Sequence, residues 1–568
     1  ALGVANSGKV VALVGLFIAG LSQLWLGKIF QLSRFSRIWM ALLLTASGAV
    51  VGRLQMANVP LLLSTAMCML VIPAVIDLTL NGGFKKAIIL GVVLGLAILS
   101  GQGYLQIGLF ISLLPFLVYL LLGKAPSGTV LIKQNWKYFF YAGIFGILIA
   151  SPLLIPLTHN SSIIDKDSDP LYTSSQPVSY SLLNLVIDDA DYYFTNAIKK
   201  TPFPYLYINY IGWIPVVLAV WGIAHTPKQY RKMMFGFLFV ILVVYLTSSA
   251  ELFKFLEKQF SVPSFGWIRN PGPIQSLAVP FILILAGFGI DHLLNIQLPK
   301  IRLTAEQQEN TVGRMDLNLL KWAAFLLLVF FSLKSTYDFS KPWLYVLNAP
   351  TDLQVIESVK TENAEWVQPP AGEYAWFTKS MDNNLKIRYF FRPWKIKSVE
   401  VPKAYLELSR VKDDVNLPEY DKSIGDFVLL KRVENEYAYI QTSEAMIPCK
   451  AYAAGGNIDV ECDSTSAGML YVLEHAVSGW TVNIDGKPNS LIKNDWLAVA
   501  ASSGKHSYSF RYLPWDAPLG LGLGAIGWLS AFGGYLFFAI RDRKMQKTCI
   551  EEPVDTSNTG YQQKAPSF

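Results

Sequence analysis

Residues 104–122 read YLQIGLFISLLPFLVYLLL and contain no charged side chain. A helix of this length approaches the ~30 Å thickness of the hydrocarbon layer of a bilayer. Apolar blocks of roughly 17–24 residues recur along the chain and predict about eleven membrane spans, so the predicted fold class is a polytopic α-helical membrane protein. The predicted spans are centred on Val10–Gly27, Ile38–Gly52, Pro60–Leu80, Ala87–Ser100, Tyr104–Leu122, Lys137–Leu157, Tyr207–Ala224, Met233–Ser248, Pro273–Leu294, Leu319–Tyr337 and Pro518–Ile540.

The composition of the chain agrees with this fold class. Of 568 residues, 52% are hydrophobic and 16% are charged, against about 25% charged in a typical soluble protein. Residues 338–513 hold 19 Lys/Arg and 23 Asp/Glu, a net charge of −4, and the other 392 residues hold 29 and 18, a net of +11. The basic excess lies in short loops between apolar blocks, which membrane topology explains. We therefore expect membrane lipids, and no nucleic acid, among the partners.

Positive charge gathers in alternate loops between the predicted spans. These loops hold Lys28, Arg34, Arg37, Lys85, Lys86, Lys124, Lys133, Lys137, Lys228, Arg231, Lys232, Lys300, Arg302, Arg314, Lys321, Arg541, Arg543, Lys544 and Lys547. Because cytoplasmic loops carry an excess of Lys and Arg, the basic loops are predicted to be cytoplasmic. Residues 1–337 are then a membrane domain with outer loops at 158–206 and 250–272. Residues 338–513 are an extracytoplasmic domain, 514–540 the last span and 541–568 a disordered cytoplasmic tail.

The predicted extracytoplasmic domain has the pattern of a β-protein. Short runs such as Phe427–Val433, Met469–Leu473 and Ser507–Tyr512 are typical of strands. Trp480–Asp485 runs into an Asp-Gly pair, which predicts a hairpin turn. Short strands separated by turn residues favour a β-sandwich over a parallel sheet.

Two of the four cysteines flank a symmetric stretch, CKAYAAGGNIDVEC, from Cys449 to Cys462. A two-residue turn at its Gly-Gly pairs Ala454 with Asn457, and counting outward pairs the two cysteines. They fall at a non-hydrogen-bonded position, where opposing Cα atoms are about 4.5 Å apart, a separation that a disulfide accepts. An oxidising outer compartment permits the bond. We predict a structural disulfide; the alternative is a facing pair of reduced thiols.

Several blocks occur in an order that is typical of one family. GWTVNIDGK (479–487) and SGKHSYSFRYLP (503–514) precede the last predicted span. Upstream lie LSG (99–101), YIG (210–212) and FGWIRNP (265–271), the last running into LAGFGID (285–291). Together these blocks resemble YfhO-like bacterial membrane proteins, and the resemblance covers most of the chain.

The resemblance implies a function of the type found in GT-C glycosyltransferases. Such multi-span enzymes take a sugar from a polyprenyl-phosphate carrier and act at the outer face of the membrane. It implies a multi-pass protein of the bacterial cytoplasmic (inner) membrane that modifies envelope glycans or lipids.

The chain departs from the family pattern at its start. Members usually begin with a span and an acidic first outer loop, which supplies the catalytic carboxylate in GT-C enzymes, and nothing in the chain matches it. We expect either that sequence is missing upstream, which we favour, or that a protein partner supplies or contacts the N-terminal region. The alternative function is a non-catalytic structural or assembly subunit of a larger envelope complex.

Carboxylates in the loop 158–206 are the catalytic and metal candidates. Asp188, Asp189 and Asp191 follow an apolar segment and are candidates for the general base that takes the acceptor proton. Asp165, Asp167 and Asp169 are alternative candidates for a divalent metal, the one cofactor considered. Their spacing fails the EF-hand pattern, because its glycine and glutamate positions hold Pro170 and Gln176.

Two arginines are candidates for binding the substrate phosphate. Arg53 ends the second predicted span in a loop without other charge, and Arg269 lies just before another span. A guanidinium offers a fork of donors that matches phosphate. The alternative is an interfacial arginine whose head reaches lipid headgroups.

Overall fold

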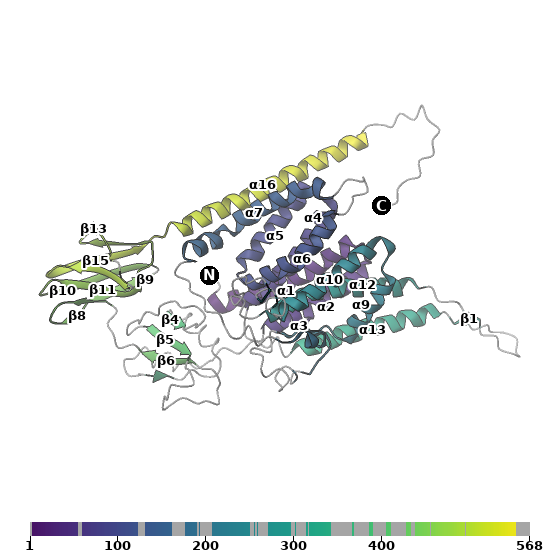
Figure 1. Cartoon of the computed structure of the whole chain (residues 1–568), viewed down its shortest axis with the longest axis horizontal. Helices are drawn as coiled ribbons and strands as arrows, with labels where there is room; N and C mark the ends of the chain where they lie inside the picture. The colour runs from purple at the N-terminus through teal and green to yellow at the C-terminus, as the bar shows by residue number, and fades with distance from the viewer. Residues whose placement is uncertain are drawn as a thin grey trace.

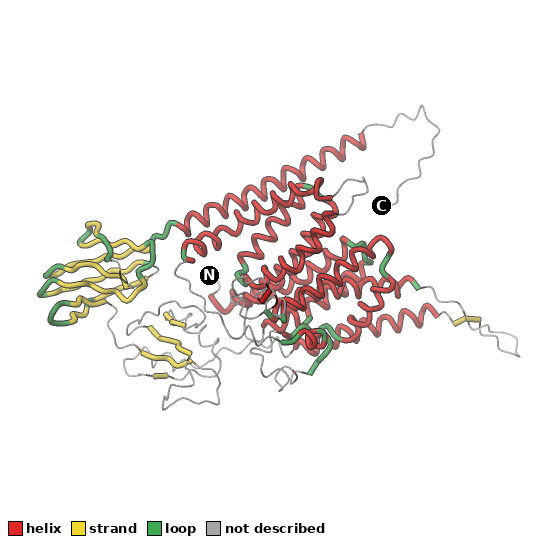
Figure 2. The backbone as a smooth tube through the Cα atoms, in the orientation of Figure 1, coloured by secondary structure: helices red, strands yellow, loops and turns green. Residues whose placement is uncertain are grey.

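The computed structural model of the chain has two parts, a bundle of apolar helices and a C-terminal β-region (Figures 1 and 2). The residues that the structure describes are 3–54, 59–122, 131–161, 176–189, 192, 207–249, 255, 258–259, 271–296, 301–302, 314–315, 317–341, 366–367, 386–389, 405–410, 428–432, 438–454, 456–492, 494 and 496–551.

Eight helical segments among these residues are long and apolar enough to cross a membrane. They are α1 (Gly3–Ile29), α2 (Arg34–Ala46) with α3 (Gly48–Val51) and η1 (Gly52–Leu54), α4 (Val59–Asn81), α7 (Leu131–His159), η7 (Lys228–Tyr230) with α10 (Arg231–Ser248), η9 (Gly272–Ala278) with α12 (Val279–Asn295), α13 (Leu317–Ser340) and α16 (Asp516–Glu551). Three further predicted spans coincide with α5 (Phe84–Leu99), α6 (Gly103–Leu122) and α9 (Trp213–His225). Each predicted span therefore contains a helix, while the number of crossings and their direction stay predictions.

The centre of the bundle is formed by α4 and α12. Every residue of α12 from Val279 to Ile290 is buried, and most of α4 is buried as well. Outer helices instead expose large apolar side chains, such as Phe17 on α1 (70% exposed) and Leu529 on α16 (72% exposed). Side chains of this kind on a spanning helix face lipid, so the helices form a membrane protein in contact with the bilayer.

Glycines let α9 and α12 approach closely. A Cβ atom on Gly222 would overlap the carbonyl oxygen of Leu285, and one on Gly289 would overlap that of Leu218. Helices in membranes use small residues for such contacts, because backbone packing replaces the hydrophobic driving force that water supplies.

The last helix, α16, packs along α7 (Figure 1). Gly520 and Gly524 of α16 lie against Ser151 and Pro152 of α7, and Ser151 Oγ donates a hydrogen bond to the carbonyl oxygen of Gly520 at 2.8 Å. The helix continues to Glu551, ten residues beyond Arg541. Residues 541–551 therefore differ from the predicted disordered tail; Lys, Arg, Gln and Glu in this stretch are good helix formers.

Two antiparallel sheets share one core immediately before α16. One has the order β13-β12-β15-β10-β9 and the other β14-β11-β7-β8. Their strands are β7 (Ala438–Gln441), β8 (Met446–Pro448), β9 (Lys450–Ala454), β10 (Asn457–Ser464), β11 (Gly468–His475), β12 (Trp480–Ile484), β13 (Lys487–Asn489), β14 (Trp496–Ala501) and β15 (Gly504–Tyr512). Side chains from both sheets, including Val460, Leu470 and Phe510, form the shared core. We call this unit the β-domain.

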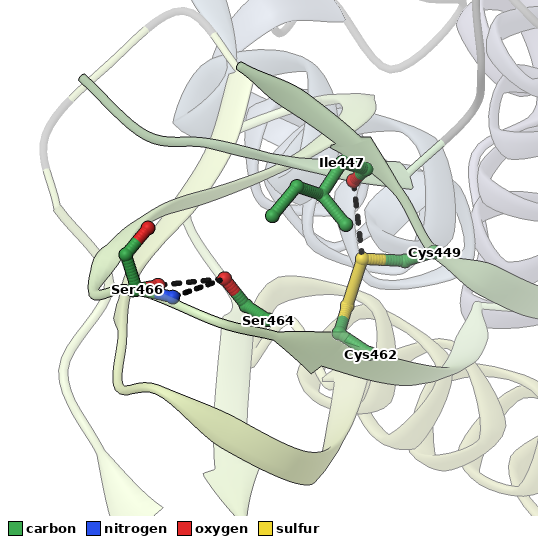
Figure 3. Close-up of a disulfide and its surroundings, with 5 residues drawn as sticks. All are labelled: Ile447, Cys449, Cys462, Ser464 and Ser466. Carbon is green, nitrogen blue, oxygen red and sulfur yellow. Dashed lines mark hydrogen bonds between the residues drawn. A yellow bond between two sulfur atoms is a disulfide. The ribbon is translucent and has the colours of Figure 1, made fainter. Parts of the chain in front are cut away.

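The predicted hairpin and disulfide are both present in the β-domain. Ile484 pairs with Lys487, and Asp485 and Gly486 both have positive φ (47° and 77°), as a type I′ turn requires. The predicted register between β9 and β10 is found, with Asn457 opposite Ala454. Cys449 and Cys462 form a disulfide with their Cα atoms 4.8 Å apart (Figure 3).

A separate four-stranded sheet precedes the β-domain along the chain. It has the order β3-β6-β5-β4, from β3 (Trp366–Val367), β4 (Lys386–Tyr389), β5 (Tyr405–Arg410) and β6 (Val428–Arg432). β4 and β5 pair in parallel, so residues 338–513 contain more than the single predicted sandwich. Fifteen residues separate these two strands, enough for the crossover that a parallel pair needs. A two-stranded sheet, β1 (Ile301–Arg302) and β2 (Arg314–Met315), lies between α12 and α13.

Candidate functional site

Three of the residues predicted from the sequence to form the site lie in the described part of the chain. Asp188 and Asp189 follow η4 (Leu183–Leu185) and are exposed, whereas Arg53 lies in η1 and is 1% exposed. Asp191, Arg269, Asp165, Asp167 and Asp169 lie outside the described residues.

Backbone hydrogen bonds bring the segments of Arg53 and Asp188 to one place. The amides of Ile211 and Gly212 both donate to the carbonyl oxygen of Leu185, at 2.9 and 3.0 Å, and the amide of Gly48 donates to that of Tyr210 at 2.9 Å. Residues 207–212 therefore connect α3 and η1 to the segment that ends in Asp188 and Asp189. We call this meeting of residues 48–54, 176–189, 207–212 and 271–278 the junction.

A cluster of buried amide side chains holds the junction together. Asn184 Nδ2 donates to Gln176 Oε1 at 2.7 Å and to Gln275 Oε1 at 3.0 Å. Asn209 Nδ2 donates to the same oxygen of Gln275 at 3.1 Å, and Gln275 Nε2 donates to Ser181 Oγ at 3.2 Å. All five side chains are at most 1% exposed. Buried polar groups that lose a partner cost free energy, so this network fixes the loop against η9.

Arg53 enters the junction from η1. Gly52 lies against Ile208, where a Cβ atom would come within 3.1 Å, and Arg53 is among the largest fully buried side chains. The interfacial alternative, in which the head of Arg53 reaches lipid headgroups, does not fit this burial. Arg53 thus brings a positive charge into the junction, next to the segment that carries Asp188 and Asp189.

The end of α13 closes the junction on one side. Tyr210 Oη and Ser335 Oγ share a hydrogen bond of 2.6 Å, and the rings of Tyr210 and Phe339 stack with centroids 4.2 Å apart. Tyr192 packs on the same cluster, and burial first, then the charge of Tyr180, raises the pKa of its phenol. Tyr192 therefore stays neutral at physiological pH.

A second polar group, which the sequence did not indicate, connects the β-domain to the helices. His159 Nδ1 lies 2.8 Å from Asp516 Oδ2, and His159 Nε2 lies 3.1 Å from Ser478 Oγ. Asn160 Nδ2 also donates to Asp516 Oδ2, at 3.1 Å, and the His159 ring lies against Trp515. If His159 is neutral and donates a hydrogen bond from Nδ1 to Asp516, its Nε2 accepts a hydrogen bond from the Ser478 hydroxyl. We call Ser478, His159, Asn160 and Asp516 the joint.

Ser478 contacts His159, and His159 contacts Asp516. The same succession of contacts is found in a catalytic triad, but catalysis by a triad also requires hydrogen-bond donors for the oxyanion that develops in the reaction. At the joint, Gly479 lies against Pro514, where a Cβ atom would come within 2.9 Å, and the Leu513 amide donates to the Gly479 carbonyl at 2.8 Å. The chain itself therefore packs against the residue next to Ser478. We interpret the joint as a structural connection between the β-domain, α7 and α16.

Within the described residues, no group of three or more His, Cys, Asp or Glu side chains is close enough to hold a metal ion. Asp188 and Asp189 are two adjacent carboxylates, which would need further ligands. Comparison of the chain with protein-family models, curated proteins and solved structures found no match in any of the three.

Proposed function

We propose that the chain is a YfhO-type, GT-C-like membrane glycosyltransferase that uses a polyprenyl-phosphate-linked sugar. The junction is its proposed substrate site. The single observation that supports this most is the burial of Arg53 in the same junction as the segment carrying Asp188 and Asp189. A cation and carboxylates gathered at the end of membrane helices are the groups that such a transfer requires.

Each residue has a proposed role. Arg53, with Arg269 from the segment that leads into η9, binds the phosphate and stabilises its charge as the sugar leaves. Asp188 or Asp189, with Asp191 nearby in the sequence, takes the proton from the acceptor hydroxyl. The amide cluster positions this carboxylate segment and takes no part in the chemistry.

The proposal includes the predicted topology. In it, about eleven spans place the junction and the β-domain outside the bacterial inner membrane, and the basic loops inside. The β-domain then lies where it meets an acceptor glycan or a protein partner.

The test is sugar transfer by the full chain in proteoliposomes that contain a polyprenyl-phosphate sugar. Arg53→Gln, Asp188→Asn and Asp189→Asn are compared with Glu444→Gln, which removes an exposed carboxylate of the β-domain. We expect Arg53→Gln and at least one Asp variant to lose 100-fold or more in rate, and the control to keep full activity. Thermal unfolding of Arg53→Gln, compared with that of the wild type, separates a folding defect from lost phosphate binding.

Two outcomes would count against the proposal. Full activity of all three junction variants removes the junction from the reaction. No transfer by the wild-type chain, with the protein folded, favours the alternative of a non-catalytic subunit of an envelope complex.

A further inference from the structure

A cavity of about 600 Å³ lies at the opposite end of the bundle from the joint, between the start of α5, the first turns of α7 and the part of α16 that holds Phe538 and Arg541. Among the residues that the structure describes, its lining includes four cations, Lys85, Lys86, Lys137 and Arg541, and no carboxylate. They lie on three different helices, in segments that the sequence predicted to be three separate basic loops. The alternation of basic loops along the sequence predicted that these charges lie on the same side of the membrane. In the structure they line one cavity.

Two of these cations, Lys137 and Arg541, form no ion pair with any residue that the structure describes. Asp77 at the end of α4 pairs with Lys86 at 2.6 Å and also accepts from Asn81 at 2.7 Å. Lys137 and Arg541 are exposed. Like charges collected around one cavity repel one another, so an anion in the cavity lowers the electrostatic free energy.

An aromatic wall forms the other side of the cavity. Phe84 packs on Phe538 with ring centroids 4.6 Å apart and on Tyr141 at 5.2 Å. The guanidinium of Arg541 lies over the Phe538 ring, 4.8 Å from its centroid, which orients it toward the cavity. Next to this wall on α16, the side chains of Phe537 and Ile540 are 62% and 56% exposed. Apolar chains therefore have a surface immediately beside the charges.

The backbone adds further donors. Gly82 and Gly83, both with positive φ (60° and 103°), turn the chain into α5, and no side chain caps this helix. The first amides of a 16-residue helix thus lie at the cavity lined by Phe84, Lys85 and Lys86. Helix N-termini favour anions, and here they act together with side-chain cations.

From this combination we infer that the cavity binds the phosphate group of an anionic phospholipid. Lys137, Arg541 and the first turn of α5 hold the phosphate, and the acyl chains lie along the exposed apolar side chains of α16. Basic pockets between membrane helices take anionic lipid headgroups in this way. The site is separate from the junction and is independent of the proposed glycosyl transfer.

The test measures lipid binding to the full chain, delipidated in detergent. Native mass spectrometry and thermal unfolding are recorded with phosphatidylglycerol, with phosphatidylcholine, or with inorganic phosphate alone. We expect phosphatidylglycerol to bind and stabilise, and Lys137→Gln/Arg541→Gln to weaken its binding at least fivefold. Lys137→Arg/Arg541→Lys keeps the charges and should bind as the wild type does.

The matched control is Lys228→Gln/Lys232→Gln, which removes two exposed lysines from another basic loop and should leave binding unchanged. Equal effects of phosphatidylcholine and phosphatidylglycerol overturn the inference. So does undiminished binding by the Lys137→Gln/Arg541→Gln variant. If inorganic phosphate alone reproduces the full stabilisation, the site takes a free anion and the lipid assignment is wrong.

Discussion

His159, the last residue of α7, lies 2.8 Å from the carboxylate of Asp516, the first residue of α16, although 357 positions separate them in the sequence. The Asp516 side chain is 3% exposed, and it also accepts from Asn160 and from the Ala517 amide. Because His159 simultaneously contacts Ser478, this one imidazole links two helices to the β-domain.

Replacing His159 by alanine should loosen the β-domain from the helices. The change leaves the Asp516 carboxylate, which is little exposed to solvent, with fewer hydrogen-bond partners, and this costs free energy of folding. We expect a lower midpoint of thermal unfolding and faster hydrogen exchange at the Leu513 amide, which donates to Gly479 beside the joint.

His506→Ala is the matched control, because His506 also pairs with an aspartate, Asp485, but that partner is 50% exposed. It should change stability much less than His159→Ala. Equal effects would show that burial of the partner does not matter. Covalent labelling of Ser478 by a fluorophosphonate probe would contradict the structural interpretation of the joint.

The His506–Asp485 pair itself should titrate with shifted pKa values. The Asp485 carboxylate, 2.7 Å from His506 Nδ1, and then the Ser503 carbonyl raise the pKa of His506 above its usual range. The Ser507 amide, and next His506, lower the pKa of Asp485. The His506 contribution to stability is therefore complete below about pH 6.5 and is lost as pH rises through its folded pKa. The Asp485 contribution is complete above about pH 4 and is lost as pH falls through its own folded pKa.

Histidine NMR of the intact protein measures the first shift, with the resonance assigned by His506→Gln. We expect Asp485→Asn to bring the pKa of His506 back toward its usual value. An unchanged pKa in this variant would mean that Asp485 does not hold the imidazolium.

Local patterns in the sequence predicted the helices and the hairpins, because the residues that determine each of these elements are close together in the sequence. Charge-free runs located the helices, and the Gly-Gly symmetry gave the register that brings Cys449 opposite Cys462. The amide cluster around Gln275 and the contact between His159 and Asp516 join residues 91 and 357 positions apart. Buried amides and a lone histidine carry no periodic signal, so tertiary packing alone reveals them. The role of the junction in catalysis stays a prediction.

Gly222 should tolerate no side chain at the crossing of α9 and α12. Its Cβ would overlap the Leu285 carbonyl oxygen, which is backbone and cannot move aside cheaply. Gly222→Ala should therefore destabilise the bundle by about 1–3 kcal/mol through overpacking. Gly143→Ala is the control, because a Cβ atom on Gly143 of α7 would have no neighbouring atom within 4 Å and alanine favours the helical conformation. Thermal unfolding in detergent should separate the two variants, and equal midpoints would contradict the close packing of α9 and α12.

Removing the disulfide should weaken the β-domain while leaving the helices in place. Cys449 and Cys462 close a loop with a separation of 13 residues, for which the chain-entropy estimate is about 3 kcal/mol. Non-reducing mass spectrometry of the native protein should find the two linked. Cys449→Ser/Cys462→Ser should lower the unfolding midpoint of the β-domain, with faster exchange of β9 and β10 amides and unchanged exchange in α4.

Cys68→Ser is the control, because Cys68 is a buried free thiol in α4 and its loss leaves the β-domain intact. Free thiols at both positions in protein from an oxidising compartment, or the same β-domain midpoint with and without the pair, would contradict a stabilising disulfide.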